Sequence, residues 1–265
     1  MELVRKIVRV GNSAGVVLPR EWLNGTAKVE LVRKPLDIKG DILKILEPYL
    51  EDISGIYLVG SYARGEETEN SDVDVLVITD KIGKNIESGK YSIVLVPKDV
   101  VESTLKNNAL PILPRIKEAK ALINNELIGK YKRTELTKRN LKWYLEVTKS
   151  AMKVNEAFMN FARVQGKNSK LTDGIAYSLI LNLRSVYIID CIKKEKMWSN
   201  KVLLEIIKKL YGNLNIYEGY LRSKNNLRER EDIELGGAER VYYYILKKIA
   251  EHEKWLRAKG KSKSL

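Results

Sequence analysis

The sequence predicts an α+β protein: a mixed sheet with helices in the middle, a small β-hairpin segment before it and an antiparallel helical bundle after it. Three observations support this fold class. Residues 1–35 hold short β-branched runs between turn signals, and residues 36–115 alternate between strand-like runs and helical spacing. From about Arg115 onward, apolar residues recur at helical spacing.

Charge is distributed unevenly along the 265 residues. The net charge of +14 divides into +4 in residues 1–35, −5 in 36–115 and +15 in 116–265. A basic surface of this size suits a polyanionic partner, although lysine-rich helix faces are also common as solvated surface. Both interpretations of the basic ends stay open at this point.

Apolar runs and cysteine content bear on the location of the protein. No apolar run approaches the roughly 20 residues that a helix needs to cross a bilayer. We therefore expect a soluble cytoplasmic protein with no membrane partner. The single cysteine, Cys191, excludes an internal disulfide. Because it lies in the apolar run SVYIIDCIKK, we expect a buried, inert thiol.

The first 35 residues are expected to form short strands. Apolar residues at Val4, Ile7, Val10 and 16–18 surround a turn signal at 11–13. Pro19 ends a strand before a helical turn at 20–23, and a third strand is expected at about 27–33. A unit this small cannot bury its own core, since chains below about 40 residues need a partner or a staple. Pairing with a second copy would supply that core.

The pattern V-x-V-G-N-S-x-G-V-x-L-P, from Val8 to Pro19, resembles the swapped-hairpin DNA-binding module of the AbrB/MazE class of toxin–antitoxin regulators. The resemblance covers only the first segment. It implies an intertwined homodimer whose basic edge meets DNA through Arg5, Lys6, Arg9 and Asn12. Lysine and arginine would neutralise phosphates there, and Asn12 would hydrogen-bond to a phosphate or a base. The alternative is a dimerisation hairpin without DNA binding.

Residues 36–115 alternate in the way that α/β units do. Apolar residues at helical spacing predict a helix over Leu36–Asp52. The runs GIYLVG, VDVLVIT and YSIVLVP predict three buried strands, and Asp99 can cap a short helix after the third. A mixed sheet backed by helices is the economical arrangement of these elements.

Two aspartates stand at the start of the second of these strands. Because side chains alternate along a strand, Asp72 and Asp74 project from one face while Val73 and Val75 pack on the other. Two adjacent anions repel, and a hard divalent cation shared between them relieves the repulsion. The pair therefore predicts a Mg²⁺ site.

A Gly-Ser pair precedes the aspartates. Gly60 permits a tight turn, and Ser61 is suited to cap a short helix that Gly65 closes. N–H groups at such a helix start, with a hydroxyl beside them, suit phosphate oxygens. Arg64 either adds charge to this site or pairs with a neighbouring glutamate on the surface.

The full spacing G-S-x-A-R-G-x5-S-D-x-D-x-x-V, from Gly60 to Val77, resembles the nucleotidyltransferase fold of the DNA polymerase beta superfamily, particularly its minimal MNT-type branch. The resemblance implies a nucleotidyltransferase mixed sheet with helices and an ATP-binding, magnesium-dependent activity. The transferred group would be a nucleoside monophosphate, AMP from ATP, and the acceptor a hydroxyl of a protein or nucleic acid. Asp72 and Asp74 would be catalytic and bind Mg²⁺, and the nucleotide would be held by Gly60, Ser61, Arg64 and Ser71.

One position departs from this family. A third carboxylate is usual on a following strand, and the corresponding place here holds Ser92, with Glu87 and Asp99 flanking the strand. Either transfer is reduced, or a carboxylate arrives from elsewhere, or the site only binds nucleotide. In the last case the chain is an antitoxin-type DNA-binding regulator whose central domain is degenerate and non-catalytic.

Four long amphipathic segments follow, at residues 135–164, 171–196, 199–224 and 237–259, with breakers between them. Short connections predict an antiparallel bundle. The bundle resembles HEPN-like bundles and the carboxy-terminal domain of kanamycin-type nucleotidyltransferases, which implies substrate or partner binding.

HEPN ribonucleases carry an arginine a few residues before a histidine. The only histidine here, His252, follows YYYILKKIAE, which contains no arginine. We therefore expect no ribonuclease and a solvated His252. The expected domains are residues 1–35, 36–128 and 129–265.

Overall fold

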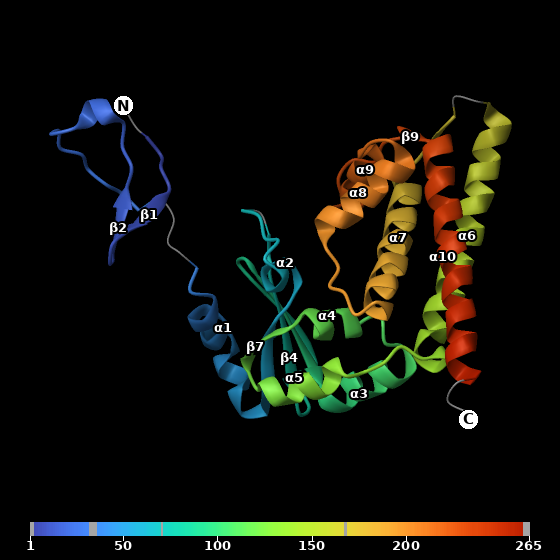
Figure 1. The fold of residues 1–265 in the computed structure, drawn as a ribbon, viewed down its shortest axis with the longest axis horizontal. Helices are drawn as coiled ribbons and strands as arrows, with labels where there is room; N and C mark the ends of the chain where they lie inside the picture. Colours follow the sequence, from blue (N-terminus) through green and yellow to red (C-terminus); the bar gives the residue numbers. More distant parts are fainter. Residues whose placement is uncertain (1–2, 32–35, 70, 167–168, 262–265) are drawn as a thin grey trace. The chain divides into compact units, whose positions relative to one another are not determined.

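The computed structural model describes residues 3–31, 36–69, 71–166 and 169–261 (Figure 1). The chain divides into two compact units, Met1–Asp37 and Ile38–Leu265.

The first unit contains a hairpin of β1 (Ile7–Val10) and β2 (Ser13–Val16), paired antiparallel, followed by a single helical turn, η1 (Arg20–Trp22). Gly11 makes the hairpin turn at φ +57°. Both the hairpin and the helical turn agree with the sequence patterns.

The expected third strand is wrong over residues 27–31, which have no strand structure, and residues 32–33 lie outside the described part. A strand needs a neighbour to pair with, and the described part of this unit offers only a two-stranded hairpin. None of residues 3–31 is buried, and Val17 is 69% exposed. A two-stranded hairpin without buried residues is at best marginally stable in water by itself.

The second unit is built on a five-stranded sheet of order β5-β6-β4-β3-β7. Its strands are β3 (Ile53–Leu58), β4 (Val73–Thr79), β5 (Lys84–Ser88), β6 (Tyr91–Pro97) and β7 (Lys120–Ile123). β4 and β6 are parallel and the other neighbours antiparallel, so the sheet is mixed as expected.

Helices cover both faces of this sheet (Figure 1). On one face, α1 (Ile38–Leu46) packs Ile42 and Leu46 against Val73, Val75 and Val77 of β4. The other face carries Leu76 and Ile78, whose core includes side chains of the next three helices: α3 (Lys98–Asn107), α4 (Leu113–Glu118) and α5 (Asn125–Lys132). The helix expected over Leu36–Asp52 begins at Ile38 and becomes a 3-10 helix, η2 (Glu47–Asp52), where Pro48 lacks the N–H of an α-helical bond.

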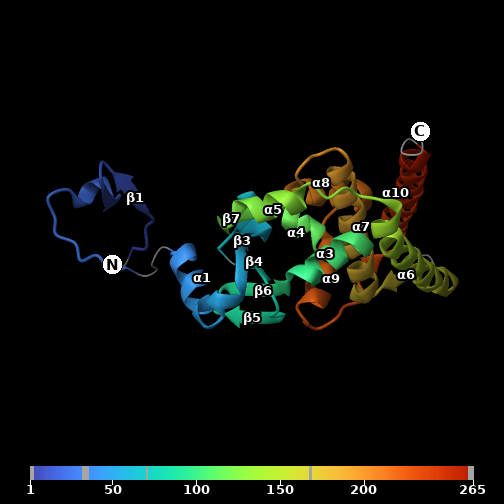
Figure 2. The ribbon, with the colours of Figure 1, turned by 90° about the horizontal axis from the view of Figure 1, so that it is seen from below.

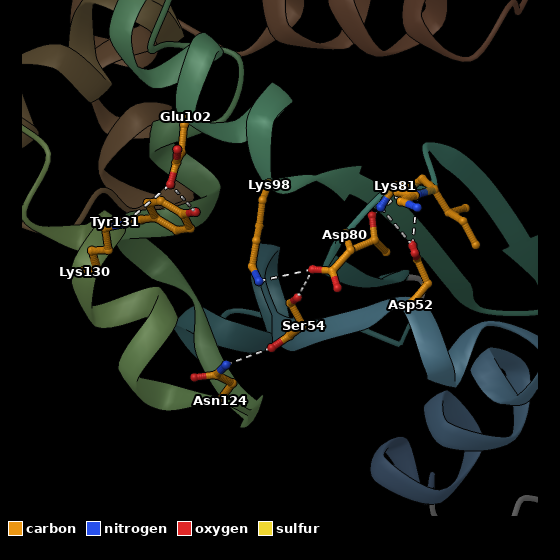
Figure 3. A network of polar contacts seen from close by, with 11 residues as sticks. Asp52, Ser54, Asp80, Lys81, Lys98, Glu102, Asn124, Lys130 and Tyr131 are labelled. Atoms are coloured by element: carbon orange, nitrogen blue, oxygen red, sulfur yellow. Dashed lines mark hydrogen bonds and ion pairs between the residues drawn. The ribbon is translucent and has the colours of Figure 1, made fainter.

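Polar contacts close the end of the sheet where β4 finishes (Figure 3). Asp80 Oδ1 accepts hydrogen bonds from Ser54 Oγ at 2.7 Å and from Lys98 Nζ at 3.1 Å. Asp52 Oδ2 accepts one from the backbone N–H of Lys81 at 3.2 Å. These contacts join β3, β4 and α3 at the end remote from Asp72 and Asp74.

The bundle contains α6 (Lys138–Gln165), α7 (Asp173–Lys193), α8 (Asn200–Tyr211), α9 (Asn215–Lys224) and α10 (Leu235–Lys261). The third expected segment is two helices, because Gly212 ends α8 at φ +108°. α6 and α10 run side by side (Figures 1 and 2), and the bundle core is continuous with the sheet face that holds Leu76.

α7 corrects the expectation that no apolar run approaches membrane-spanning length. Within the described residues it is the one helix long and apolar enough to cross a bilayer, with 21 residues and a mean hydropathy of 1.5 over its most apolar stretch. Core helices meet the same criteria, and α7 packs against α6, α9 and α10. Its Asp173 is fully buried and pairs with Arg222 at 2.6 Å, as in a protein core.

His252 also differs from its expectation, because it is fully buried. It continues the inward stripe of α10 formed by Val241, Ile245 and Ile249, and its Nε2 lies 2.9 Å from Asp190 Oδ1. Its helical spacing, and not the charged residues beside it in sequence, decides its burial. Cys191 is buried as a free thiol, as expected.

Candidate active site

Asp74 lies on the sheet face opposite α1. It is the second residue of β4, between Val73 and Val75, which are buried beneath α1. Asp74 is half-buried, and Asp72, just before the strand, is exposed. The strand alternation expected from the sequence therefore places the Asp74 carboxylate away from the apolar face.

Gly60 lies against this carboxylate. It begins α2 (Gly60–Arg64) with φ +71°, and a Cβ built on it would lie 2.2 Å from Asp74 Oδ2. No side chain fits at this contact, and the backbone angle independently favours glycine. The backbone N–H of Val59 also donates to the Asp74 carbonyl at 2.9 Å. The Gly-Ser turn and the aspartate strand are thus in direct contact.

Ser61 does not cap α2 as expected. The N-cap residue is Val59, which makes no side-chain cap bond, whereas Gly65 closes the helix in the left-handed region as expected. Glu118 caps the helix instead: its Oε1 accepts a hydrogen bond from the Gly60 N–H at 2.7 Å. Sequence reasoning missed Glu118, whose one signal is that it is the single carboxylate in the segment LPILPRIKEAKAL.

Arg64 is held inside the protein. Its guanidinium pairs with Glu118 at 2.5 Å and with Glu66 at 3.0 Å, with side-chain exposures of 6% for Arg64 and 5% for Glu118. Burial acts to lower the pKa of Arg64, and the hydrogen bonds to the two glutamates outweigh it and raise that pKa. The pairing with a neighbouring glutamate is present, but it is buried and not on the surface.

Glu66 joins this cluster to the bundle. Its Oε2 accepts the backbone N–H of Asn200, the first residue of α8, at 3.2 Å. Burial acts to raise the pKa of Glu66, but hydrogen bonds from Ser199, Arg64 and Asn200 lower it. The turn after α2 is therefore anchored to a helix well over a hundred residues away in sequence.

The electrostatics around Asp74 disfavour an isolated anion. Burial raises the pKa of Asp74, the nearby Arg115 opposes that rise, and the charges of Glu118 and Asp72 add to it. A hard divalent cation between carboxylates offsets such a cost. Oxygen donors on a strand, with a glycine leaving room beside them, therefore fit a cation of this type.

The described residues do not bring three metal-ligating side chains together. Across residues 3–31, 36–69, 71–166 and 169–261, no group of three or more His, Cys, Asp or Glu side chains is arranged to hold a metal ion.

The strand register shows what lies beside Asp74. Asp74 pairs with Ser92 of β6, and Ser92 pairs with Glu87 of β5. Directly opposed residues share a sheet face, so all three point to the same side. Ser92 Oγ also donates to Glu87 Oε1 at 2.9 Å. Asp99 lies in the first turn of α3, just after the opposite end of β6.

The other predicted site residues have local roles. Ser71 Oγ accepts the Thr68 N–H at 2.9 Å and so holds the turn before β4. In the first unit, Arg9 Nε donates to the Gly11 carbonyl at 2.9 Å, across the hairpin turn that contains Asn12. Arg5 and Lys6 line a hollow of about 490 Å³ with residues 17–19.

Comparisons with known proteins address the second unit. Residues 40–169 match the family model described as nucleotidyltransferase domain, just under half of the chain. Among curated proteins, none matches the sequence.

Two solved structures are similar at low identity. A nucleotidyltransferase-like protein from Exiguobacterium sibiricum is 14% identical, with 81% of this chain and 75% of that chain covered and a TM-score of 0.35. Spectinomycin adenyltransferase AAD(9) from Enterococcus faecialis, solved with ATP and spectinomycin, is 14% identical, with 80% and 97% covered and a TM-score of 0.37.

The family match coincides with the structural features that surround Asp74. It contains the mixed sheet, the glycine contact and both aspartates. The central part of the chain is therefore a nucleotidyltransferase domain, and the chain is an enzyme of the nucleotidyltransferase class.

Proposed function

We propose that the protein is a Mg²⁺-dependent nucleotidyltransferase that moves a nucleoside monophosphate, AMP from ATP, onto a hydroxyl of a protein or nucleic-acid acceptor. The contact between Gly60 and Asp74 carries the proposal, since it sets the Gly-Ser turn against the Asp74 carboxylate. A triphosphate held by that turn would have its reacting phosphorus beside Asp72 and Asp74.

Each residue then has a chemical role. Asp72 and Asp74 would hold Mg²⁺, which when bound supplies charge neutralisation at the phosphates and activation of the attacking hydroxyl. The acceptor oxygen forms a bond to the α-phosphorus, the bond to the β-phosphate oxygen breaks, and pyrophosphate leaves with that electron pair. Ser61, in the first turn of α2, would contact phosphate oxygens.

We propose narrower roles for two residues than the family resemblance implies. The Gly60 amide is engaged by Glu118, so Gly60 serves chiefly by leaving space for Asp74. Arg64 is engaged by Glu118 and Glu66, so it contributes charge and holds the turn without a direct bond to the nucleotide. Ser71 supports the turn before β4.

Glu87 is the carboxylate best placed to take the proton of the attacking hydroxyl. It shares a sheet face with Asp74 and binds Ser92, the position where a third acid is expected. Two strand spacings, about 10 Å, separate the backbones of Asp74 and Glu87.

Labelled ATP tests the activity. Transfer of label to protein, RNA or DNA is measured with and without Mg²⁺ in the wild type, in Asp72→Ala with Asp74→Ala, and in Asp99→Ala as the control carboxylate. We expect the double variant to lose about a hundredfold or more, because even outer-shell ligand losses cost tenfold to a hundredfold. If the double variant transfers label as well as the wild type, or if the protein does not bind ATP with Mg²⁺, the proposed nucleotidyltransferase activity is wrong.

We further propose that residues 1–35 pair with a second copy and meet DNA through Arg5, Lys6, Arg9 and Asn12. The absence of any buried residue among 3–31 supports the pairing, since a second copy would cover the exposed apolar side chains. The cationic edge supports contact with phosphates.

DNA binding by the full chain is measured against salt concentration, and oligomeric state by sedimentation. Arg9→Ala with Asn12→Ala should weaken binding and flatten the salt dependence, while Arg20→Ala, outside the hairpin, serves as control. Absent or salt-independent binding contradicts the DNA role, and a monomer contradicts the pairing.

A second candidate function follows from Ser92, which stands where a third carboxylate is expected. In this reading the chain is an antitoxin-type DNA-binding regulator that binds nucleotide without turning it over. DNA binding together with ATP binding, but without any transfer, would favour it.

A further inference from the structure

A cavity of about 560 Å³ lies in the second unit, between the α4–α5 region and the end of α7 with the loop that follows it. Five cationic side chains line its wall: Lys117, Lys132, Arg133, Lys193 and Lys196. Two carboxylates, Glu135 and Glu195, oppose them. The volume is that of a small-molecule site, and the excess of cations favours an anionic occupant over a cationic one.

Backbone contacts fix two of these ammonium groups. Lys117 Nζ donates to the carbonyl of Lys132, and Lys132 Nζ donates to the carbonyl of Ala119 at 2.7 Å. Carbonyl oxygens orient an ammonium group without neutralising its charge. These two lysines therefore present positive charge from fixed positions, as a site for phosphate requires.

Aromatic side chains form part of the same wall. Trp198 is 5% exposed and packs with Ile188 and Cys191, so its position is fixed by the core. Trp255 also lines the cavity and carries Lys193 Nζ 5.1 Å from its ring centroid. Fixed cations interleaved with aromatic rings are the combination that holds a phosphate and a nucleobase together.

The cavity is connected to the nucleotidyltransferase site on two sides. Lys117 directly precedes Glu118, which binds Gly60 and Arg64. Trp198 closely precedes Asn200, whose N–H binds Glu66. Both walls of the cavity are thus attached, within a residue or two, to the groups that hold α2.

We propose that this cavity is a second nucleotide site, separate from the Asp72–Asp74 site, which binds a phosphorylated nucleotide either free or as the terminal nucleotide of a nucleic-acid strand. Its cations bind the phosphate and its indole rings contact the base. The further identification of this nucleotide as the acceptor rests on the proposed transferase activity, whereas its binding does not.

Binding is measured by calorimetry on the full chain in EDTA, so that the metal-dependent site is not loaded. The probes are AMP, ribose 5-phosphate, and a short single-stranded RNA with and without a 5′-phosphate. The cavity variant is Arg133→Glu with Lys196→Glu, both at exposed positions. Lys153→Glu with Lys209→Glu, exposed on α6 and α8, makes the same change of net charge elsewhere.

AMP or the phosphorylated RNA should bind at least about tenfold more weakly to the cavity variant, as expected for lost charge-assisted contacts, and unchanged to the control. AMP binding tighter than ribose 5-phosphate supports the base contact. Tight binding of AMP identifies a free nucleotide, and binding of phosphorylated RNA alone identifies a strand end.

The same titration in Asp72→Ala with Asp74→Ala separates this site from the catalytic one. Undiminished binding in that variant supports the second site, even if labelled-ATP transfer is never detected. Loss of binding there, equal affinities for the cavity variant and its control, or no binding of any probe overturns the proposal.

Discussion

The backbone amide of Gly60 donates a 2.7 Å hydrogen bond to Oε1 of Glu118, 58 residues further along the chain. The other carboxylate oxygen of Glu118 pairs with Arg64, so one side chain from α4 holds both ends of α2. The turn that faces Asp74 is therefore fixed before any nucleotide arrives. Such preorganisation keeps a reacting group in place at no further cost during the reaction.

Replacing Glu118 should be among the most damaging changes in the second unit. Glu118→Ala leaves the buried Arg64 with one partner and the Gly60 amide with none, and breaking a buried pair costs about 3–5 kcal/mol. Glu66→Ala is the matched control, because its carboxylate also pairs with Arg64 but is 22% exposed. Urea unfolding measures both variants, and an equal loss in the two would contradict the buried role of Glu118.

Glycines at positions 60 and 65 offer a matched pair of variants. Both have φ +71°, but only at Gly60 would a Cβ meet another atom within 4 Å, the Asp74 carboxylate. Gly65→Ala should cost about 1–2 kcal/mol of backbone strain and leave activity intact. Gly60→Ala should cause the same backbone strain and also displace the Asp74 carboxylate. We expect that displacement to lower transfer by about a hundredfold. Thermal unfolding and labelled-ATP transfer separate the two effects.

Glu87 should matter for transfer and Asp99 should not. Glu87→Gln preserves the size of the side chain and its contact with Ser92, but removes the base, so transfer should fall by about a hundredfold. Asp99→Asn changes a carboxylate in the first turn of α3, beyond the other end of β6, and should leave transfer unchanged. The readout is the pH profile of transfer, in which Glu87→Gln should also remove the lower limb. An unchanged profile would exclude Glu87 as the base.

Much of the fold follows from local pattern. The strands β3, β4 and β6 are rich in β-branched and other apolar residues and hold most of the buried positions of the sheet, and such segments are visible in a sequence. The edge strands β5 and β7 are short and largely exposed, so their sequences show no hydrophobic pattern that predicts a strand. Their existence depends on the partner strand that they pair with.

The candidate site also contains residues that the sequence could predict and residues that it could not. Gly60, Asp72 and Asp74 lie within one short stretch, and the resemblance of that stretch to the nucleotidyltransferase motif implied that they form one site. Glu118 and Glu87 reach the site through tertiary packing and strand register, which no local spacing encodes. Ser61 was expected to cap α2 because capping is usually local, and here the distant Glu118 replaces it.

A second buried cluster, in the bundle, predicts how stability depends on pH. The carboxylate of Asp190 meets His252 Nε2 at 2.9 Å and Lys248 Nζ at 2.8 Å. Burial acts to raise the pKa of Asp190, but the hydrogen bonds and charges of His252 and Lys248 outweigh it and hold that pKa well below its ordinary value.

Because the folded-state pKa of Asp190 lies below the unfolded value of about 3.9, ionised Asp190 stabilises the fold at neutral pH. That contribution is complete above about pH 4 and is lost as the pH falls further toward the folded-state pKa. Asp190→Asn should therefore cost about 2–3 kcal/mol at pH 7, and its deficit against the wild type should shrink below about pH 4. Urea unfolding from pH 7 to pH 2 measures this, with Glu205→Gln, an exposed carboxylate of α8, as control. A deficit that stays constant with pH would show that Asp190 acts through packing and not through its charge.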